Sequence, residues 1–135
     1  MARLKAAAVL MLVALLAFSA GGCKAGGPGP GTAVEEALAA MAAEDGETMS
    51  SFFTRDTRPY VVSGMTFILE RIDEIRVSGV RTRVVSEGEG AATVEAEYDL
   101  ETVSSGGTRD SHVVKTVTLL EEEGEWRISD LSLLE

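Results

Sequence analysis

The sequence predicts an α+β domain in which N-terminal helices pack on a curved, four-stranded antiparallel meander sheet. Two observations lead to this prediction. Apolar residues recur at helical spacing from Val34 to Ile72, whereas from Ile75 onward they alternate with polar residues, as strands require. Three short polar or glycine-containing segments divide this second region, and each is short enough to be a hairpin connection. We expect the domain to span residues 32–135.

The first helix is expected to begin at Thr32, because residues 32–35 fit a capping box with Glu35 at its third helical position. Asp45 and Gly46 are expected to end this helix, since glycine readily takes the left-handed conformation found after helices.

Two further helices are expected before the sheet. One is short and lies around residues 49–53. Residues 54–59 are expected to form a loop, because the residue before a proline disfavours helix. The other helix is expected from about Met65 to Asp73, since Gly64 interrupts the apolar spacing just before it.

Four strands are expected, over residues 75–86, 91–103, 110–121 and 125–134. In the first strand, Gly79 lies where the apolar alternation changes phase, which predicts a β-bulge.

Charge and apolar pattern together predict the register, because a slip of one residue would exchange the two faces of a strand. In the second hairpin we expect Lys115 opposite Glu97. The first hairpin is expected to pair Val84 with Val94, Arg83 with Glu95, Thr82 with Ala96, Arg81 with Glu97 and Val80 with Tyr98.

This register places the even-numbered residues from His112 to Leu120 on the inner face, toward the helices, together with Trp126 and Ile128. An apolar patch is then left on the outer face, which predicts a surface for a homodimer or a protein partner. Two alternatives stay open: the tether or a neighbouring loop covers the patch, or a bulge shifts the phase. The patch consists of Val113, Val117, Leu119, Leu131 and Leu133.

Four carboxylates on the second strand point the same way, which raises the question of a metal site. Basic residues on the neighbouring strands are placed to neutralise them, so we expect a salt-bridged outer face instead. The carboxylates are those of Glu95, Glu97, Asp99 and Glu101, and the basic residues are Arg81, Arg83 and Lys115.

The first 22 residues have the order of segments found in secretory signal peptides. Arg3 and Lys5 are basic, residues 6–18 are apolar throughout, and residues 19–22 are small. As a helix, the apolar run would span about 20 Å, which is less than the roughly 30 Å of a bilayer core. A cleaved signal peptide over residues 1–22 therefore fits better than a transmembrane anchor.

Residues 20–23 resemble a bacterial lipobox, in which small residues directly precede a cysteine after the apolar run. The resemblance implies lipidation of Cys23, cleavage before it and acylation of the new N terminus, and several acyl chains together give a stable anchor. Residues 24–31 are rich in Gly and Pro, which predicts a tether. The expected location is the extracytoplasmic face of a bacterial cell membrane, and the alternative is a secreted protein with a free thiol.

The composition excludes several classes of partner. The net charge is −10, and loss of the leader, with its two basic residues and no acidic one, makes it −12. Such a chain repels nucleic-acid phosphates and anionic lipid headgroups, so we expect no nucleic-acid partner and no charge-driven membrane binding. We expect no cofactor or metal, because no cofactor motif is recognisable and one His with one Cys cannot form a zinc site.

The order of helices followed by a meander, together with three sequence features, resembles the nuclear transport factor 2-like fold. More narrowly, the chain resembles bacterial lipoproteins of unknown function that carry this fold. The features are the break at Asp45 and Gly46, the strand at 91–100, and residues 119–129, where two leucines and an acidic turn precede a Trp-Arg-Ile-Ser ending. The resemblance implies a cone-shaped pocket between helices and sheet. With the register above, its polar lining would include Tyr98, His112, Thr116 and Asp130.

Two functions are consistent with these features, since a fold alone does not specify one. The first is a non-catalytic, membrane-tethered module of the cell envelope that binds a protein partner or a small apolar ligand. The alternative is an extracytoplasmic enzyme of the isomerase or dehydratase type. Superfamily enzymes such as ketosteroid isomerase use a pocket Asp as base and a Tyr as hydrogen-bond donor. The corresponding candidates here are Tyr98 and Asp130, with His112 as a further one.

Overall fold

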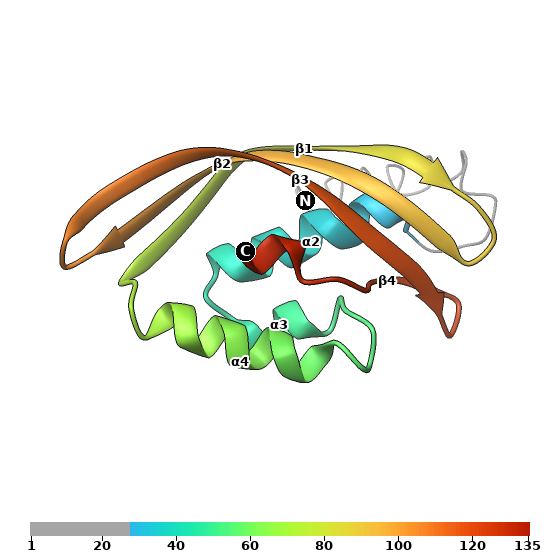
Figure 1. Ribbon diagram of the computed structural model, residues 1–135, viewed down its shortest axis with the longest axis horizontal. Helices are drawn as coiled ribbons and strands as arrows, with labels where there is room; N and C mark the ends of the chain where they lie inside the picture. Colours follow the sequence, from blue (N-terminus) through green and yellow to red (C-terminus); the bar gives the residue numbers. More distant parts are fainter. Residues whose placement is uncertain (1–27) are drawn as a thin grey trace, which may run out of the picture.

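The computed structural model describes residues 28–135 (Figure 1). A four-stranded antiparallel sheet in the order β1-β2-β3-β4 arches over the helices, and α2 lies directly beneath it. The predicted α+β meander is confirmed. The elements are α2 (Pro30–Ala42), α3 (Gly46–Ser50), α4 (Arg58–Leu69), β1 (Glu74–Glu87), β2 (Ala91–Ser104), β3 (Gly107–Glu122), β4 (Glu125–Ile128) and the 3-10 helix η2 (Ser132–Leu134).

Helix α2 begins two residues before the expected start. Pro30 occupies its first position, where the missing N–H costs nothing, and Gly29 precedes it without a side-chain cap. The predicted capping box is wrong, because Thr32 lies inside the helix. The Glu35 carboxylate instead accepts a hydrogen bond from the Thr82 hydroxyl at 2.7 Å, which joins α2 to β1.

The break after α2 lies where it was expected, although other residues make it. Glu44 takes the left-handed conformation with φ 61°, and Gly46 is the first residue of α3. The Asp45 carboxylate accepts hydrogen bonds from the Thr48 amide at 3.1 Å and from the Thr48 hydroxyl at 2.7 Å. These bonds cap α3 and lower the pKa of Asp45.

Helix α4 starts at Arg58, well before the predicted Met65. Pro59 lies in its first turn, where proline is tolerated, so it marks a helix start and not a loop. Gly64 remains inside the helix. A Cβ atom at this position would lie 3.2 Å from Leu134 Cδ1, so the glycine makes room for the C-terminal segment.

The first hairpin has the predicted register from Arg81 to Val84. The predicted bulge is also confirmed: Gly79 has φ 63°, and the register shifts between Ser78 and Arg81. Tyr98 therefore lies opposite the bulge, and the predicted pairing with Val80 does not form.

The second hairpin differs from the prediction by one residue. Lys115 lies opposite Ala96, and Val114 takes the expected place opposite Glu97. The strands continue to a pair between Ser104 and Gly107, which leaves only two residues for the turn. A two-residue turn fixes the register, whereas the predicted six-residue loop left it to the charge pattern.

This slip exchanges the two faces of β3, so the predicted outer apolar patch lies inside the molecule. Val117 and Leu119 are fully buried, Leu133 is 4% exposed, and Val113 and Leu131 pack against the same core. Conversely, the residues expected inside are exposed on the outer face: His112, Val114, Thr116, Thr118 and Leu120.

Strand β4 is shorter than predicted, because the chain leaves the sheet after Ile128. Ile128 is buried opposite Leu119, so its predicted place on the inner face is confirmed. Residues 129–135 then turn back under the sheet (Figure 1), and η2 contacts β3 and α4.

Candidate functional site

An apolar groove of about 160 Å³ lies under the inner face of the sheet, between α4, the start of β1 and the C-terminal segment. Seven of its nine lining residues have aliphatic or thioether side chains, so the groove suits a small apolar group. Apart from the C-terminal segment, the groove is lined by Met41 of α2, Ile68 of α4, Ile72 of the loop after α4, Ile75 of β1, and Leu100 and Thr102 of β2.

The C-terminal segment closes one side of this groove with Leu133, Leu134 and Glu135. Asp130 holds the start of the segment. Its Oδ2 accepts from the Thr118 amide at 3.1 Å, and its Oδ1 accepts from the Ser132 hydroxyl at 2.9 Å and from the Ser132 amide at 3.3 Å. Asp130 is therefore a structural clamp between β3 and η2.

Lys115 reaches the far end of this segment. It lies on the inner face, because its partner across the ladder, Ala96, is fully buried. Its Nζ donates a hydrogen bond to the backbone oxygen of Glu135 at 3.0 Å. None of the ion pairs within residues 28–135 includes Lys115.

The predicted register places Lys115 on the outer face opposite Glu97, so the sequence does not reveal its place at this site. A signal was present: Lys115 shares one face of the strand with Val113, Val117 and Leu119, which places one lysine among apolar residues. The two-residue turn would have been needed to choose that face.

Tyr98 is part of the core. It is 1% exposed, and burial raises the pKa of its phenol. It pairs with Val113, whereas Asp130 is bound to Thr118, five residues further along β3. At the rise of a strand this is about 16 Å, so the structure does not bring Tyr98 and Asp130 to a common point.

The outer face carries a second polar cluster, centred on His112. Its Nδ1 lies 2.7 Å from Asp99 Oδ1, and its Nε2 lies 2.7 Å from Glu97 Oε2. The hydrogen bonds with Asp99 and then Glu97 raise the pKa of His112. In turn, the hydrogen bond with His112, followed by the charge of Arg81, lowers the pKa of Glu97.

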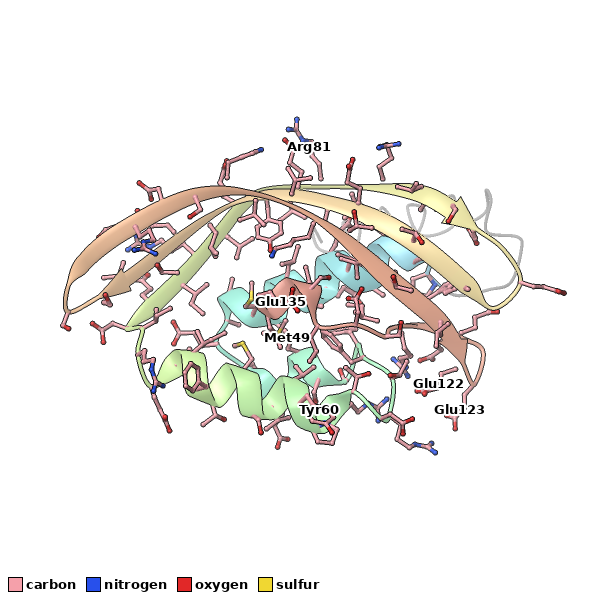
Figure 2. All side chains as sticks on the ribbon, in the orientation of Figure 1. Met49, Tyr60, Arg81, Glu122, Glu123 and Glu135 are labelled. Atoms are coloured by element: carbon pink, nitrogen blue, oxygen red, sulfur yellow. The ribbon has the colours of Figure 1, made fainter. Side chains whose placement is uncertain are left out.

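The two other carboxylates that β2 directs to this face, those of Glu95 and Glu101, are paired with arginines, as expected for a salt-bridged surface. Arg83 lies 3.0 Å from Glu95, and Arg81 lies 3.3 Å from Glu97. Arg76, which the sequence argument did not include, bridges Glu101 at 2.6 Å and Glu74 at 2.9 Å. Figure 2 shows Arg81 projecting from the outer face, on the side of the sheet opposite to Met49 and Glu135.

A shallow hollow of about 520 Å³ lies on this outer face. It is larger than the inner groove, but it is open to solvent, and several of its charged side chains are paired, Arg76 with Glu101 and His112 with Asp99. Within residues 28–135, no three His, Cys, Asp or Glu side chains are placed to hold a metal ion. The side chains around the hollow include Arg76, Ser78, Asp99, Glu101, Asp110 and His112.

The signal peptide, the lipobox and Cys23 lie outside the described residues. Residues 28–31 belonged to the predicted tether, and helix α2 takes up the last two of them. None of the helices in the described part of the chain has the length and apolar character needed to cross a bilayer.

The sequence matches no family model and no curated protein. Solved structures do resemble it, three of them from Novosphingobium aromaticivorans. A provisionally assigned aromatic ring hydroxylase has a TM-score of 0.61 at 13% identity, covering 73% of this chain and 83% of its own. A cystatin-fold protein without assigned activity has a TM-score of 0.55 at 13% identity, covering 76% and 97%.

The third is a provisionally assigned scytalone dehydratase, with a TM-score of 0.53 at 13% identity, covering 72% of this chain and 74% of its own. The chain has a cystatin-like, nuclear transport factor 2-like fold. At these identities the likeness extends to the fold alone. The helices beneath a curved meander are what these proteins share.

Proposed function

We propose that this protein is a membrane-anchored lipoprotein of the bacterial cell envelope whose extracytoplasmic domain is a non-catalytic binding module. The apolar groove under the sheet carries the binding part of this proposal. Its helix and strand walls provide aliphatic contacts and few polar groups, which suits a small apolar ligand. The outer face is less suited to such a ligand, because it is polar and its three arginine–glutamate pairs are exposed to solvent.

The lipid anchor is supported by the sequence before the domain. Residues 20–23 resemble a lipobox, and a Gly/Pro-rich segment follows Cys23. The described domain begins at about residue 30, so the anchor and the fold lie close together along the chain. An acidic domain without a basic surface would need such an anchor to stay at an anionic membrane.

The rival proposal is an enzyme of the isomerase or dehydratase type using Tyr98 and Asp130. The provisional assignments of two similar structures as a hydroxylase and a dehydratase favour it. Against it stand the burial of Tyr98 in the core and the use of Asp130 as a clamp for η2. We therefore favour the binding module.

Two measurements test the proposal. Intact-mass analysis of the full chain expressed in a bacterium should find a lipid-sized mass increment that the Cys23→Ser variant lacks. A wild-type protein without that increment would disprove the anchor. For binding, titration with octan-1-ol should shift the amide resonances of groove residues such as Ile72 and Leu100, and an unchanged spectrum would contradict an apolar site.

A further inference from the structure

Helix α4 carries two large aromatic side chains on its exposed side. Tyr60 is 65% exposed and Phe67 is 56% exposed, and their spacing of seven residues places both on one face of the helix. Ser63 lies between them and Arg71 follows them, and both are exposed. We call these four residues the α4 aromatic face. Figure 2 shows Tyr60 pointing away from the sheet, on the side of the molecule opposite to Arg81.

The polar groups at this face already have partners. The Arg71 guanidinium lies 3.6 Å from the centre of the Phe67 ring, and its Nη1 donates to the Phe67 carbonyl at 3.0 Å and lies 3.9 Å from the Glu70 carboxylate. The Thr66 hydroxyl donates to the Val62 carbonyl at 2.9 Å. A less polar surrounding can therefore cover the face without leaving these groups unpaired, which would be costly.

The charge of this region differs from that of the rest of the chain. Helix α4 contains no acidic residue, and residues 55–71 carry three arginines and two carboxylates, in a chain with 22 acidic and 12 basic residues. The outer face of the sheet, in contrast, displays the β2 carboxylates from Glu95 to Glu101. Anionic lipid headgroups repel the acidic side of such a molecule more than its nearly neutral side. A domain held close to a membrane would thus turn α4 toward it.

The proposed anchor lies near the same end of the molecule. Pro28 follows Cys23 by five residues, which span at most about 18 Å when fully extended. Pro28 and Phe52 line one pocket, and the neighbouring Phe53 carbonyl accepts a hydrogen bond from Arg58 Nε, at the start of α4, at 3.1 Å. A lipid on Cys23 would hold this end of the domain beside the bilayer. At that effective concentration, a weak contact through two aromatic rings is enough.

We propose that the α4 aromatic face is the surface through which the domain rests on the lipid bilayer. The rings of Tyr60 and Phe67 enter the headgroup layer, where aromatic side chains are favoured, and the Arg71 charge stays among the headgroups. The outer face of the sheet then points away from the membrane, because it lies on the opposite side of the molecule from α4 (Figure 1). This inference rests on the proposed lipid anchor and adds to it the docked surface and the orientation of the domain.

Tryptophan fluorescence tests this orientation in the full, lipidated chain. Trp126 is the only tryptophan, so Trp126→Phe gives a silent background. In this background, Phe67→Trp places a probe on α4, and Val114→Trp places a matched probe on the outer face, since Val114 is 55% exposed. The vesicles contain equal parts of phosphatidylglycerol and a phosphatidylcholine brominated in the upper acyl chain. The Phe67→Trp probe should lose about half of its emission or more, because interfacial side chains lie about 5–10 Å deep.

The Val114→Trp probe should keep its emission in the same vesicles. Adding Tyr60→Glu to the Phe67→Trp protein should restore much of the lost emission, because it places a carboxylate in the docked face. Leu120→Glu is the matched control, since it replaces an exposed apolar side chain by the same acid on the outer face of β3. It should leave the quenching of the Phe67→Trp probe unchanged.

Flotation of the same vesicles separates this inference from the proposed anchor. If the lipidated protein floats but the Phe67→Trp probe is no more quenched than the Val114→Trp probe, the anchor stands and the inference is overturned. That result is also the one expected if a second copy or another protein covers the α4 aromatic face. If the wild-type chain does not float with the vesicles, the proposed anchor fails and the inference fails with it.

Discussion

The two faces of the sheet differ in the partners and the solvent exposure of their charged side chains. On the outer face, Arg83 is paired with Glu95, and His112 is held between Asp99 and Glu97, all in contact with water. On the inner face, Lys115 lies among apolar neighbours and binds a backbone oxygen. Water and counterions screen the charges of the outer face, so losing an ion pair there should change the free energy of unfolding only slightly. Substitutions on the inner face should lower the free energy of unfolding by more.

Neighbouring leucines on β3 give the sharpest test of this difference. Leu119 is 0% exposed and Leu120 is 43% exposed. Leu119→Ala should lower the free energy of unfolding by about 2–5 kcal/mol, because it leaves a cavity in the core. Leu120→Ala should lower it by no more than about 1 kcal/mol. Urea unfolding of both variants measures this difference. A larger loss for Leu120→Ala would contradict the placement of Leu119 on the buried face of β3.

The second-largest loss in the free energy of unfolding is expected from removing Asp130, which holds the start of the C-terminal segment. Asp130→Ala removes the acceptors of the Thr118 amide and the Ser132 hydroxyl and should cost about 1–2 kcal/mol in urea unfolding. Asp110→Ala is the control, since Asp110 is exposed and the structure gives its side chain no hydrogen bond within residues 28–135. Equal losses for the two variants would contradict a structural role for Asp130.

Breaking an outer ion pair should have a small effect. Arg83→Gln removes the partner of Glu95, and both side chains are exposed to water. The free energy of unfolding should change by less than about 1 kcal/mol, and the difference should shrink further in high salt. A loss comparable to that of Asp130→Ala would show that the outer face contributes more to stability than its exposure suggests.

The smallest expected effect is a pH dependence centred on His112. The pKa of His112 is raised in the folded protein, so its protonated form stabilises the fold. This contribution is complete at pH values below the ordinary histidine pKa of about 6.5, and it is lost as the pH rises through the raised pKa. Glu97 acts oppositely: its pKa is lowered, so its contribution is lost only in more acidic solution. The stability difference between wild type and His112→Gln should therefore shrink from about pH 5.5 to about pH 8.5.

Urea unfolding at the two pH values measures this difference, with Thr116→Val as a control that leaves the cluster in place. A difference that is the same at both pH values would show that the two carboxylates do not hold His112 protonated in solution.

Part of the candidate site could be predicted from the sequence. The walls from α2, β1 and β2 follow from the periodicity around Met41, Ile75 and Leu100, because local patterns decide which face of an element is apolar. The arginine pairs with Glu95 and Glu97 were predictable for the same reason: a three-residue connection and the alternation of β1 and β2 left one register.

Other parts depended on choices that no local pattern decides. For β3, both faces offered apolar residues, and the pairing of Lys115 with Glu97 was as plausible chemically as its actual place opposite Ala96. The two-residue turn between Ser104 and Gly107 made the choice, and with it sent His112 to the outer face and Lys115 to the inner one. Asp130 was similarly ambiguous, since an isolated acidic residue near a strand end has several equally ordinary roles.

The sequence by itself determined the class of the fold, the acidic charge and the lipobox-like leader, because each depends on composition or on short-range periodicity. The tertiary structure alone decided which side of β3 faces the helices, that Gly64 leaves room for Leu134, and that the chain leaves the sheet after Ile128 so that residues 133–135 close one side of the groove. These features arise where segments distant in sequence meet, and there packing and turn geometry outweigh local preference.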